Sequence, residues 1–380
     1  MGISDAEALL YIDTQQDADN FLDDISGVRE IAIDTEGASF HRFIDRIYLL
    51  QISTRDCSAI IDPLPIGMPQ RLGAILEDPD VEVVFHDADY DLRLLHQDYG
   101  WHVNHIFDTR IASQLLGIKA FGLAALLDQF FGVKLDKKHQ RADWSLRPLT
   151  RGMLDYAAQD TRYLLDLRDE LKARLEKLGR WTWAREEFDR LEGTKWGDDD
   201  SSMAFLKIKG ARDLSRRELA LLRELVPWRD SVAKEVDRAT FRVMGNEVLL
   251  EIARTAPKTV KDLSSLKGMP RGILDRGAIA ILSAVQRGLE VADEELPRFP
   301  RAPKWEREDD FDSRVAKLKN VRDAAATRLL VDPGVLCSRE RLEAVARRKP
   351  ESLRDLEDIP GLRKWQMDEM GEQFVQVLRN

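Results

Sequence analysis

The chain has 380 residues, of which 43% are hydrophobic and 33% are charged, and its 58 basic and 68 acidic residues give a formal net charge of −10. This composition is typical of a soluble globular protein with two or three domains, and no apolar run reaches the roughly 18 residues of a membrane span. Cys57 and Cys337 are the only cysteines, which excludes a disulfide framework or a Cys-rich zinc site. Together with an acidic N terminus that lacks the basic region of a secretory signal, they predict a cytoplasmic protein.

The first 180 residues are predicted to form strands and helices in an alternating order. Strands are expected at 9–12, 29–34, 46–54, 57–62, 81–85 and 106–107, and helices at 17–22, 69–77, 87–98, 109–116, 123–131 and 150–178. The third and fourth strands are expected to form a hairpin. Three antiparallel strands followed by strands that alternate with helices predict a mixed sheet of five to six strands flanked by helices, which is an α/β fold.

The second of these strands, within R-E-I-A-I-D-T-E at 29–36, is followed by two acids. Asp34 and Glu36 are two residues apart, so on a strand both side chains leave the same face. Neighbouring carboxylates at the end of a core strand repel each other and are costly to desolvate. A hard divalent ion such as Mg²⁺ would remove that conflict. The alternative is a surface turn with two solvated acids.

Three more acids occur in F-H-D-A-D-Y-D-L, directly after a later strand. Asp87 is expected to cap the next helix, and Asp89 to face solvent. Asp91 lies one turn into that helix beside inward-facing leucines, which makes it a candidate metal ligand. The alternative is an exposed helix carboxylate. His86 is expected to form a hydrogen bond at the edge of the core rather than to bind a metal.

A third candidate is the segment L-D-Y-A-A-Q-D in the last helix of this half. Tyr156 and Asp160 are four residues apart and therefore share one helix face. A phenol one turn from a carboxylate can place a water beside a metal. Alternatively, the Tyr is half in the core and the Asp is on the surface. Taken together, four acids on one strand and two helices match the requirement of two-metal nucleases for about four carboxylates around two ions.

These motifs resemble the 3′–5′ exonuclease family with the Asp-Glu-Asp-Asp signature, in its Tyr-containing subclass, and within it the ribonuclease D group. The resemblance is carried by D-T-E at 34–36, H-x-x-x-x-D-L at 86–92, F-D-T-R-I-A at 107–112, D-W-S-L-R-P-L at 143–149 and Y-A-A-Q-D at 156–160. It implies a ribonuclease-H-like fold for residues 1–195 and two divalent ions, Mg²⁺ or Mn²⁺. It further implies that Asp34, Glu36, Asp91 and Asp160 hold these ions and that Tyr156 orients the attacking water.

Substrate contacts are expected at two places. The family often has a large apolar residue after the second acid, as a wedge against the terminal base; here Gly37 stands there, and Phe40 and His41 are the candidates to replace it. A basic loop before Trp144 could hold the phosphate backbone, or could be a solvated charge run. Its candidate residues are Lys137, Lys138 and Arg141.

The second half of the chain is predicted to be all helical and to contain a repeat. The polar stretch at 197–202 indicates a domain boundary across which few contacts are expected. One offset of 93 residues pairs Trp228-Arg229-Asp230 with Val321-Arg322-Asp323 and continues to Gly268 and Gly361. Each copy resembles the small helicase-and-ribonuclease-D C-terminal (HRDC) domain. We expect HRDC domains at 205–295 and 305–380, joined by a Pro-rich linker at 296–304.

The resemblance implies a metal-dependent 3′–5′ exoribonuclease that trims the 3′ ends of tRNA precursors and other structured RNAs and releases nucleoside 5′-monophosphates. A monomer without a membrane partner is expected. The net negative charge does not exclude RNA, since local basic stripes can bind phosphate. Two alternatives stay open: a DNA exonuclease of the same fold, and an RNA-binding protein with an inactive nuclease fold.

Overall fold

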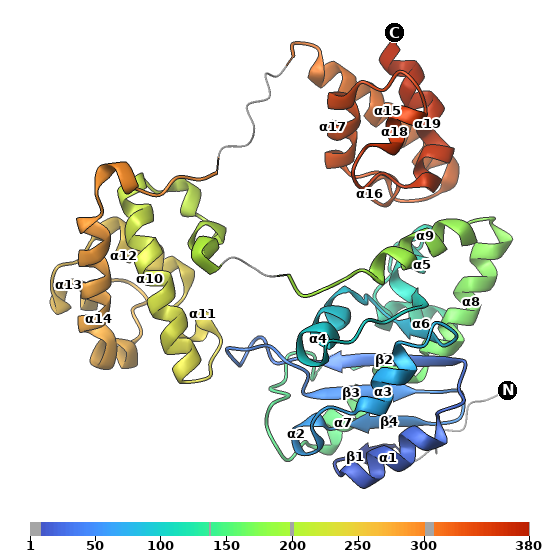
Figure 1. Ribbon diagram of the computed structural model, residues 1–380, viewed down its shortest axis with the longest axis horizontal. Helices are drawn as coiled ribbons and strands as arrows, with labels where there is room; N and C mark the ends of the chain where they lie inside the picture. Colours follow the sequence, from blue (N-terminus) through green and yellow to red (C-terminus); the bar gives the residue numbers. More distant parts are fainter. Residues whose placement is uncertain (1–8, 137, 198–200, 301–307, 380) are drawn as a thin grey trace. The chain divides into compact units, whose positions relative to one another are not determined.

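The computed structural model describes residues 9–136, 138–197, 201–300 and 308–379. The chain divides into two compact units (Figure 1). The first comprises residues 1–37, 47–196 and 306–380, and the second comprises residues 38–46 and 197–305. Each unit has its own hydrophobic core. In the described ranges no helix has the length and apolar character needed to cross a membrane.

A mixed sheet of six strands forms the centre of the first unit (Figure 1). The strands are β1 (Leu10–Ile12), β2 (Glu30–Glu36), β3 (Leu49–Ser53), β4 (Ser58–Ile61), β5 (Glu82–Phe85) and β6 (Ile106–Asp108). Their order in space is β1-β4-β3-β2-β5-β6. β2 pairs antiparallel with β3, and β3 pairs antiparallel with β4. β1 pairs parallel with β4 at one edge, and on the other side of the sheet β5 pairs parallel with β2 and β6 with β5. The predicted α/β class and mixed sheet are confirmed.

Alternate residues of β2 face two different cores, as the period of a strand requires. Ile31 and Ile33 lie in the core formed with α1, α3 and α4, and Ala32 lies in the core formed with α5, α6, α8 and α9. These helices are α1 (Gln15–Asp24), α3 (Gln70–Leu76), α4 (Asp89–Tyr99), α5 (Thr109–Leu115), α6 (Leu123–Phe131), α8 (Leu164–Lys177) and α9 (Trp181–Leu191). β2 therefore lies in the middle of the sheet, buried on both faces.

Side-chain caps start several of these helices. Asp108 accepts hydrogen bonds from the N–H groups of Arg110 and Ile111, which confirms it as the cap of α5. The cap predicted for Asp87 is wrong, because Asp87 has a left-handed backbone with φ of 71° and pairs with Arg110 instead. α4 begins only at Asp89 and has no side-chain cap.

The helix predicted at 150–178 is two helices. Thr150 caps α7 (Arg151–Arg162), and α8 follows after Tyr163, whose φ and ψ of −107° and 2° break the helical path. The break lets α7 pack on β3 and β4 while α8 packs on α5. The helical spacing of apolar residues continues through both helices, so the sequence did not indicate this change of direction.

The second unit contains a helical domain with a core of its own. Its helices are α10 (Arg216–Glu235), α11 (Thr240–Val243), α12 (Asn246–Thr255), α13 (Val260–Ser265) and α14 (Arg271–Glu290). Short 3₁₀ turns lie at Ser201–Lys207, Ala211–Asp213 and Asp293–Glu295. Ser215 starts α10 with a capping box to Glu218. Residues 198–200 of the predicted break and 301–304 of the predicted linker lie outside the described residues.

The 93-residue repeat recurs in the backbone. The second copy contains α15 (Phe311–Leu329), α16 (Pro333–Leu336), α17 (Arg339–Arg348), α18 (Arg354–Glu357) and α19 (Lys364–Arg379). Left-handed residues stand at matched positions, at 237 and 330, 256 and 349, and 268 and 361. Since left-handed backbone is uncommon outside glycine, three matches at one offset show that both copies share one fold. The described parts of both copies contain no strand, as predicted.

The second copy packs on α9 of the first unit, contrary to the expectation that few contacts cross the boundary. Trp365 stacks on Trp183 at a centroid distance of 4.8 Å, and its Nε1–H donates to Glu187 at 2.9 Å. Arg363 donates to both carboxylate oxygens of Glu187, at 2.9 and 3.1 Å. Glu186 accepts the N–H groups of Lys364 and Trp365, at the start of α19. The chain thus returns to the first unit after the other HRDC copy.

We expect Glu187→Ala to lower the free energy of unfolding of this unit by roughly 3–5 kcal/mol, because the change leaves the Arg363 guanidinium, only 7% exposed, without its partner. Denaturant unfolding followed by Trp fluorescence measures the loss. Asp189→Ala on the same helix is the control: it removes an exposed pair with Arg185 and should cost at most about 0.5 kcal/mol. Equal midpoints for the two variants would show that the α9 contact adds no stability.

Candidate active site

Two carboxylates leave the same face of β2 near its end. Asp34 and Glu36 are half-buried, and Asp34 lies opposite Gln51 of β3 in the antiparallel register. Because Asp34, Glu36 and Ala32 alternate with Ile33 and Thr35, the two acids project on the side of the sheet where α7 lies. The central position of β2 holds both backbone positions firmly.

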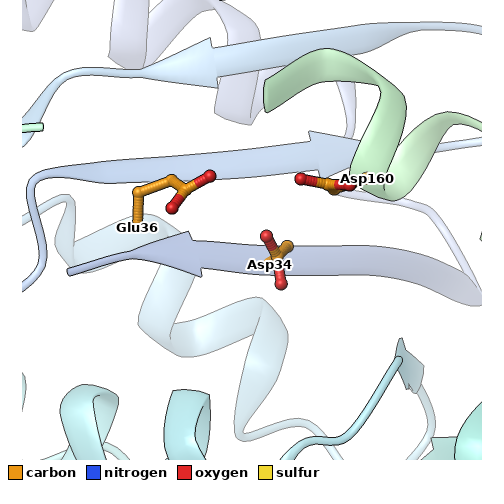
Figure 2. Close-up of side chains that lie close together, drawn as sticks. All are labelled: Asp34, Glu36 and Asp160. Atoms are coloured by element: carbon orange, nitrogen blue, oxygen red, sulfur yellow. The ribbon is translucent and has the colours of Figure 1, made fainter. Parts of the chain in front are cut away.

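A third carboxylate reaches them from α7. One carboxylate oxygen of Asp34, one of Glu36 and one of Asp160 lie within 4.8 Å of one another. Figure 2 shows the three side chains turned toward a common space. Carboxylate oxygens are the ligands that hard divalent cations prefer. The donor set therefore fits Mg²⁺ or Mn²⁺.

A buried amide beside these acids supports the same fit. Gln51 is fully buried, and within the described part of the chain neither its amide oxygen nor its amide nitrogen has a hydrogen-bond partner. Directly opposite residues of a strand pair point to one face, so this amide lies on the side of Asp34. Buried polar groups are nearly always satisfied. Ordered water around a bound ion would satisfy the Gln51 amide.

Asp91 lies at the back of the cluster, on the first turn of α4. The residue is only 5% exposed, and one of its carboxylate oxygens accepts hydrogen bonds from the N–H of Thr35 at 3.0 Å and from the Thr35 hydroxyl at 2.6 Å. These bonds tie Asp91 to β2 between Asp34 and Glu36. The predicted exposure of Asp89 is confirmed, since Asp89 pairs at the surface with Arg93.

The four acids raise one another's pKa values. Burial and then the charge of Asp160 raise the pKa of Asp34 well above its ordinary value, and burial and the neighbouring acids do the same for Glu36. Burial and the charge of Asp34 also raise the pKa of Asp91, although Thr35 opposes this. Burial and Asp91 raise the pKa of Asp160 to about 7. A bound cation would relieve this crowding and let the acids be ionised together.

Tyr156 lies one turn before Asp160 on α7, and its hydroxyl faces the same cluster. Burial, and then the charges of Asp160, Glu36 and Asp34, raise its pKa, so the phenol keeps its proton and can donate it in a hydrogen bond. The ring is held between Trp144 and His139, each at a centroid distance of 6.1 Å. Trp144 is 1% exposed and fixes one side of the ring.

Asp34, Glu36, Tyr156 and Asp160 open into one pocket of about 500 Å³. The other lining residues come from the segment between β5 and α4, from α5, from the start of α6 and the two residues before it, and from the loop before α7. They are His86, Asp87, Arg110, Phe121, Gly122, Leu123, Ala124, Ala125, Leu135, Asp136 and Gln140. A larger hollow of about 1190 Å³, on α5 and α15, has no comparable group of three acids among the described residues. The pocket on the acids is therefore the candidate active site.

Four of the five residues expected to bind substrate, Phe40, His41, Lys138 and Arg141, lie in the described ranges. Phe40 and His41 belong to the second unit, where Phe40 meets Phe241 edge-on at 6.4 Å and the His41 carbonyl accepts the N–H of Ala239. Lys138 and Arg141 do not appear among the described residues that line the pocket. Lys137 lies outside the described residues. The structure therefore does not bring Lys138 or Arg141 into the lining of the pocket, and it groups Phe40 and His41 with the other unit.

Other side chains that line the pocket were not predicted. Arg110 is the one Lys or Arg side chain in the described lining, and it lies 5.2 Å from the centroid of the Phe121 ring. The F-D-T-R motif placed Arg110 at the start of a helix, but no periodicity indicated which way it points. Gln140, inside the predicted basic loop, reaches the pocket although its charged neighbours Lys138 and Arg141 do not.

Comparisons with known proteins agree with this geometry. A family model described as a 3′–5′ exonuclease matches residues 9–176, and the HRDC domain model matches residues 218–285 and 311–378. A ribonuclease D of Granulibacter bethesdensis is 30% identical over 353 residues, which is 92% of this chain and 87% of that protein. The exonuclease model thus covers every residue of the acid cluster.

Two solved structures match nearly the whole chain. Escherichia coli RNase D, described as an exoribonuclease involved in structured RNA processing, has a TM-score of 0.76 at 25% identity, over 98% of this chain and 99% of that one. A protein from Bifidobacterium adolescentis has a TM-score of 0.82 at 26% identity, over 98% of this chain and 97% of that one. Both similarities extend through the exonuclease part and both helical repeats.

Proposed function

This chain belongs to the ribonuclease D family of 3′–5′ exoribonucleases, and we propose that its active site is the pocket lined by Asp34, Glu36 and Asp160, with Asp91 held behind it by Thr35. The observation that carries this assignment is the convergence of three carboxylate oxygens within 4.8 Å in a matched 3′–5′ exonuclease domain. Crowded acids with raised pKa values need a cation to be ionised together. The exonuclease domain is metal-dependent; that the site takes two ions, and that they are Mg²⁺ or Mn²⁺, is part of the proposal.

Each residue has a distinct role in the proposed reaction. Asp34, Glu36 and Asp160 would hold the ions, which supply a more acidic bound water and neutralise charge on the phosphate. Thr35 holds Asp91 in place through two hydrogen bonds. Tyr156, protonated, would hold the attacking water in line with the last phosphodiester. Water adds to phosphorus and gives up one proton to solvent, the bond to the O3′ of the preceding nucleotide breaks, and that oxygen takes up a proton from solvent as a nucleoside 5′-monophosphate leaves.

RNA is the partner of this family, and we propose the 3′ ends of tRNA precursors as the substrate of this chain. The support is the E. coli relative, described as acting in structured RNA processing, together with the two HRDC copies. We further propose that the chain acts in the cytoplasm as a monomer. The support is that every described lining residue of the pocket belongs to the first unit.

The test is a pair of 5′-labelled oligonucleotides of one sequence, RNA and DNA, incubated with Mg²⁺, Mn²⁺ or chelator. We expect RNA to shorten from the 3′ end with either ion and to remain intact with chelator. Release of 5′-monophosphates confirms the bond that is cleaved. Equal rates on DNA would favour the rival DNA exonuclease, and loss from the 5′ end or hydrolysis in chelator would contradict the proposal.

A further inference from the structure

The lining of the pocket contains His86, to which the proposed reaction assigns no role. His86 is the first residue after β5 and precedes α4, so it lies at the carboxyl end of a parallel strand. It lines the pocket together with Asp34, Glu36 and Asp160.

Hydrogen bonds determine which ring nitrogen carries the proton. The hydroxyl of Thr109, fully buried on α5, donates to the backbone carbonyl of Phe85 at 3.0 Å. This carbonyl can only accept, so the hydroxyl proton is used there. The same hydroxyl lies 2.9 Å from Nδ1 of His86 and must therefore accept its hydrogen. Nδ1 is protonated, and Nε2 presents a lone pair.

The ring stays neutral under ordinary conditions. Burial, and then the positive charge of Arg110, lower the pKa of His86 to about 4. Arg110 is fixed beside the ring by its ion pair with Asp87 and its contact with Phe121. In this tautomer the neutral imidazole keeps one hydrogen-bond acceptor, Nε2. This nitrogen has no hydrogen-bond partner within the described residues.

The lone pair on Nε2 of His86 can form a hydrogen bond only with a donor, so several groups that could enter the pocket cannot be its partner. Phosphate oxygens and metal-bound carboxylates are acceptors, so they offer Nε2 no hydrogen. His86 does not belong to the group of residues that could hold a metal together, which is Asp34, Glu36 and Asp160 in the described chain. The hydrogen donors that every RNA 3′ end shares, whatever its base, are the 2′- and 3′-hydroxyls of its last ribose. These are joined through C5′ to the phosphate that is attacked.

We propose that His86 is a substrate-binding residue whose Nε2 accepts a hydrogen bond from a hydroxyl of the 3′-terminal ribose. Thr109 is then a positioning residue, because it sets the tautomer without touching RNA. The inference rests on the proposed active site. It adds a contact to the sugar to the contacts with metal ions, phosphate and water that are proposed for the acids and Tyr156.

The experiment compares oligonucleotides of one sequence whose last residue is a ribonucleotide, a 2′-deoxynucleotide or a 3′-deoxynucleotide. Single-turnover rates are measured for the full chain and for His86→Ala and His86→Gln. We expect the parent enzyme to lose on the order of tenfold on one of the two deoxy ends, the size of one hydrogen bond in a site. His86→Ala should be slower on the ribose end by a similar factor and should show no further loss on that deoxy end.

His86→Gln keeps an acceptor of comparable reach, so it should recover part of the discrimination and separates a lost contact from a damaged fold. Thr109→Ser should keep the parent ratio, and Thr109→Val should reduce it, since Val cannot accept the Nδ1 hydrogen. His102→Ala, at an exposed position on the same unit, is the control and should leave the ratio unchanged.

An unchanged deoxy penalty in His86→Ala would overturn the inference. Circular dichroism of each variant verifies its fold, and if His86→Ala does not fold, the Gln and Thr109 variants decide the result alone. Failure of the active-site proposal is recognised separately. In that case Asp160→Asn would hydrolyse RNA normally, whereas an inactive Asp160→Asn with an unchanged penalty in His86→Ala would remove only the role of His86.

Discussion

Asp160→Asn is expected to lower the rate of RNA hydrolysis by on the order of 10³-fold, the range found when an enzyme loses one group that stabilises transition-state charge. The change is nearly isosteric but replaces an anionic oxygen ligand by a neutral amide. Asp34 and Glu36 then face a cation with one negative charge fewer. Asp160 is the one carboxylate of the 4.8 Å group that comes from α7, so its loss also separates that helix from the ions.

The same substitution should raise the stability of the metal-free chain. Burial and like charge raise the pKa of Asp160 to about 7, so the folded chain binds this proton more tightly than the unfolded chain. Stability without metal should therefore fall as pH rises from about 4, the unfolded value, toward 7. Asp160→Asn removes the share of this dependence that comes from Asp160, and in the parent Mg²⁺ should raise the melting temperature more at pH 8 than at pH 5.

Single-turnover hydrolysis and thermal unfolding, each with Mg²⁺ and with chelator, measure both effects. Asp155→Asn is the matched control: it is on the same helix, pairs with Arg151 at the surface and should keep the parent rate. Near-normal turnover of Asp160→Asn would exclude a metal-ligand role. A melting temperature of the metal-free parent that rises between pH 5 and pH 8 would contradict the charge crowding.

Tyr156→Phe is expected to lower the single-turnover rate by roughly 10²-fold or more, the effect typical of a positioned proton donor. The change removes one hydroxyl and keeps the ring that Trp144 and His139 hold. Because the hydroxyl meets the attacking water rather than the RNA, KM should change little. Metal affinity should also stay close to that of the parent.

The measurement is single-turnover hydrolysis with saturating RNA, combined with a binding titration in Ca²⁺ or chelator. Tyr163→Phe is the control, since Tyr163 stands at the junction of α7 and α8 and stacks on Phe131 rather than lining the pocket. A rate equal to that of the parent would remove Tyr156 from the mechanism. A large rise in KM at unchanged rate would instead assign its hydroxyl to RNA binding.

Much of the fold and the acid cluster could be predicted because the signals are local. Asp34 and Glu36 share a face through the two-residue period of a strand, and Tyr156 and Asp160 share one through the helical turn. Asp108 at the start of α5 is a cap whose hydrogen bonds close within three residues. The 93-residue repeat is likewise a property of the chain itself, and its left-handed positions recur in the backbone.

Other features depended on contacts between distant residues, and for these the sequence offered no periodicity. Asp87 was predicted as a cap, but an ion pair with Arg110 holds it in a left-handed backbone instead. Phe40 follows Glu36 closely in sequence, yet its segment belongs to the unit of the first HRDC copy.

The sequence by itself determined the strand that carries Asp34 and Glu36 and the helices that carry Asp91, Tyr156 and Asp160. The reason is that the spacing of hydrophobic residues and helix capping act over a few residues. Only the tertiary structure decided that Thr35 holds Asp91, that α19 packs on α9, and that Arg110 and His86 line the pocket. Thr35 and Asp91 are 56 positions apart in the sequence, and Glu187 and Trp365 are 178 positions apart. The free energy of such contacts comes from burial and paired charge, which depend on how whole elements pack and not on the local order of residues.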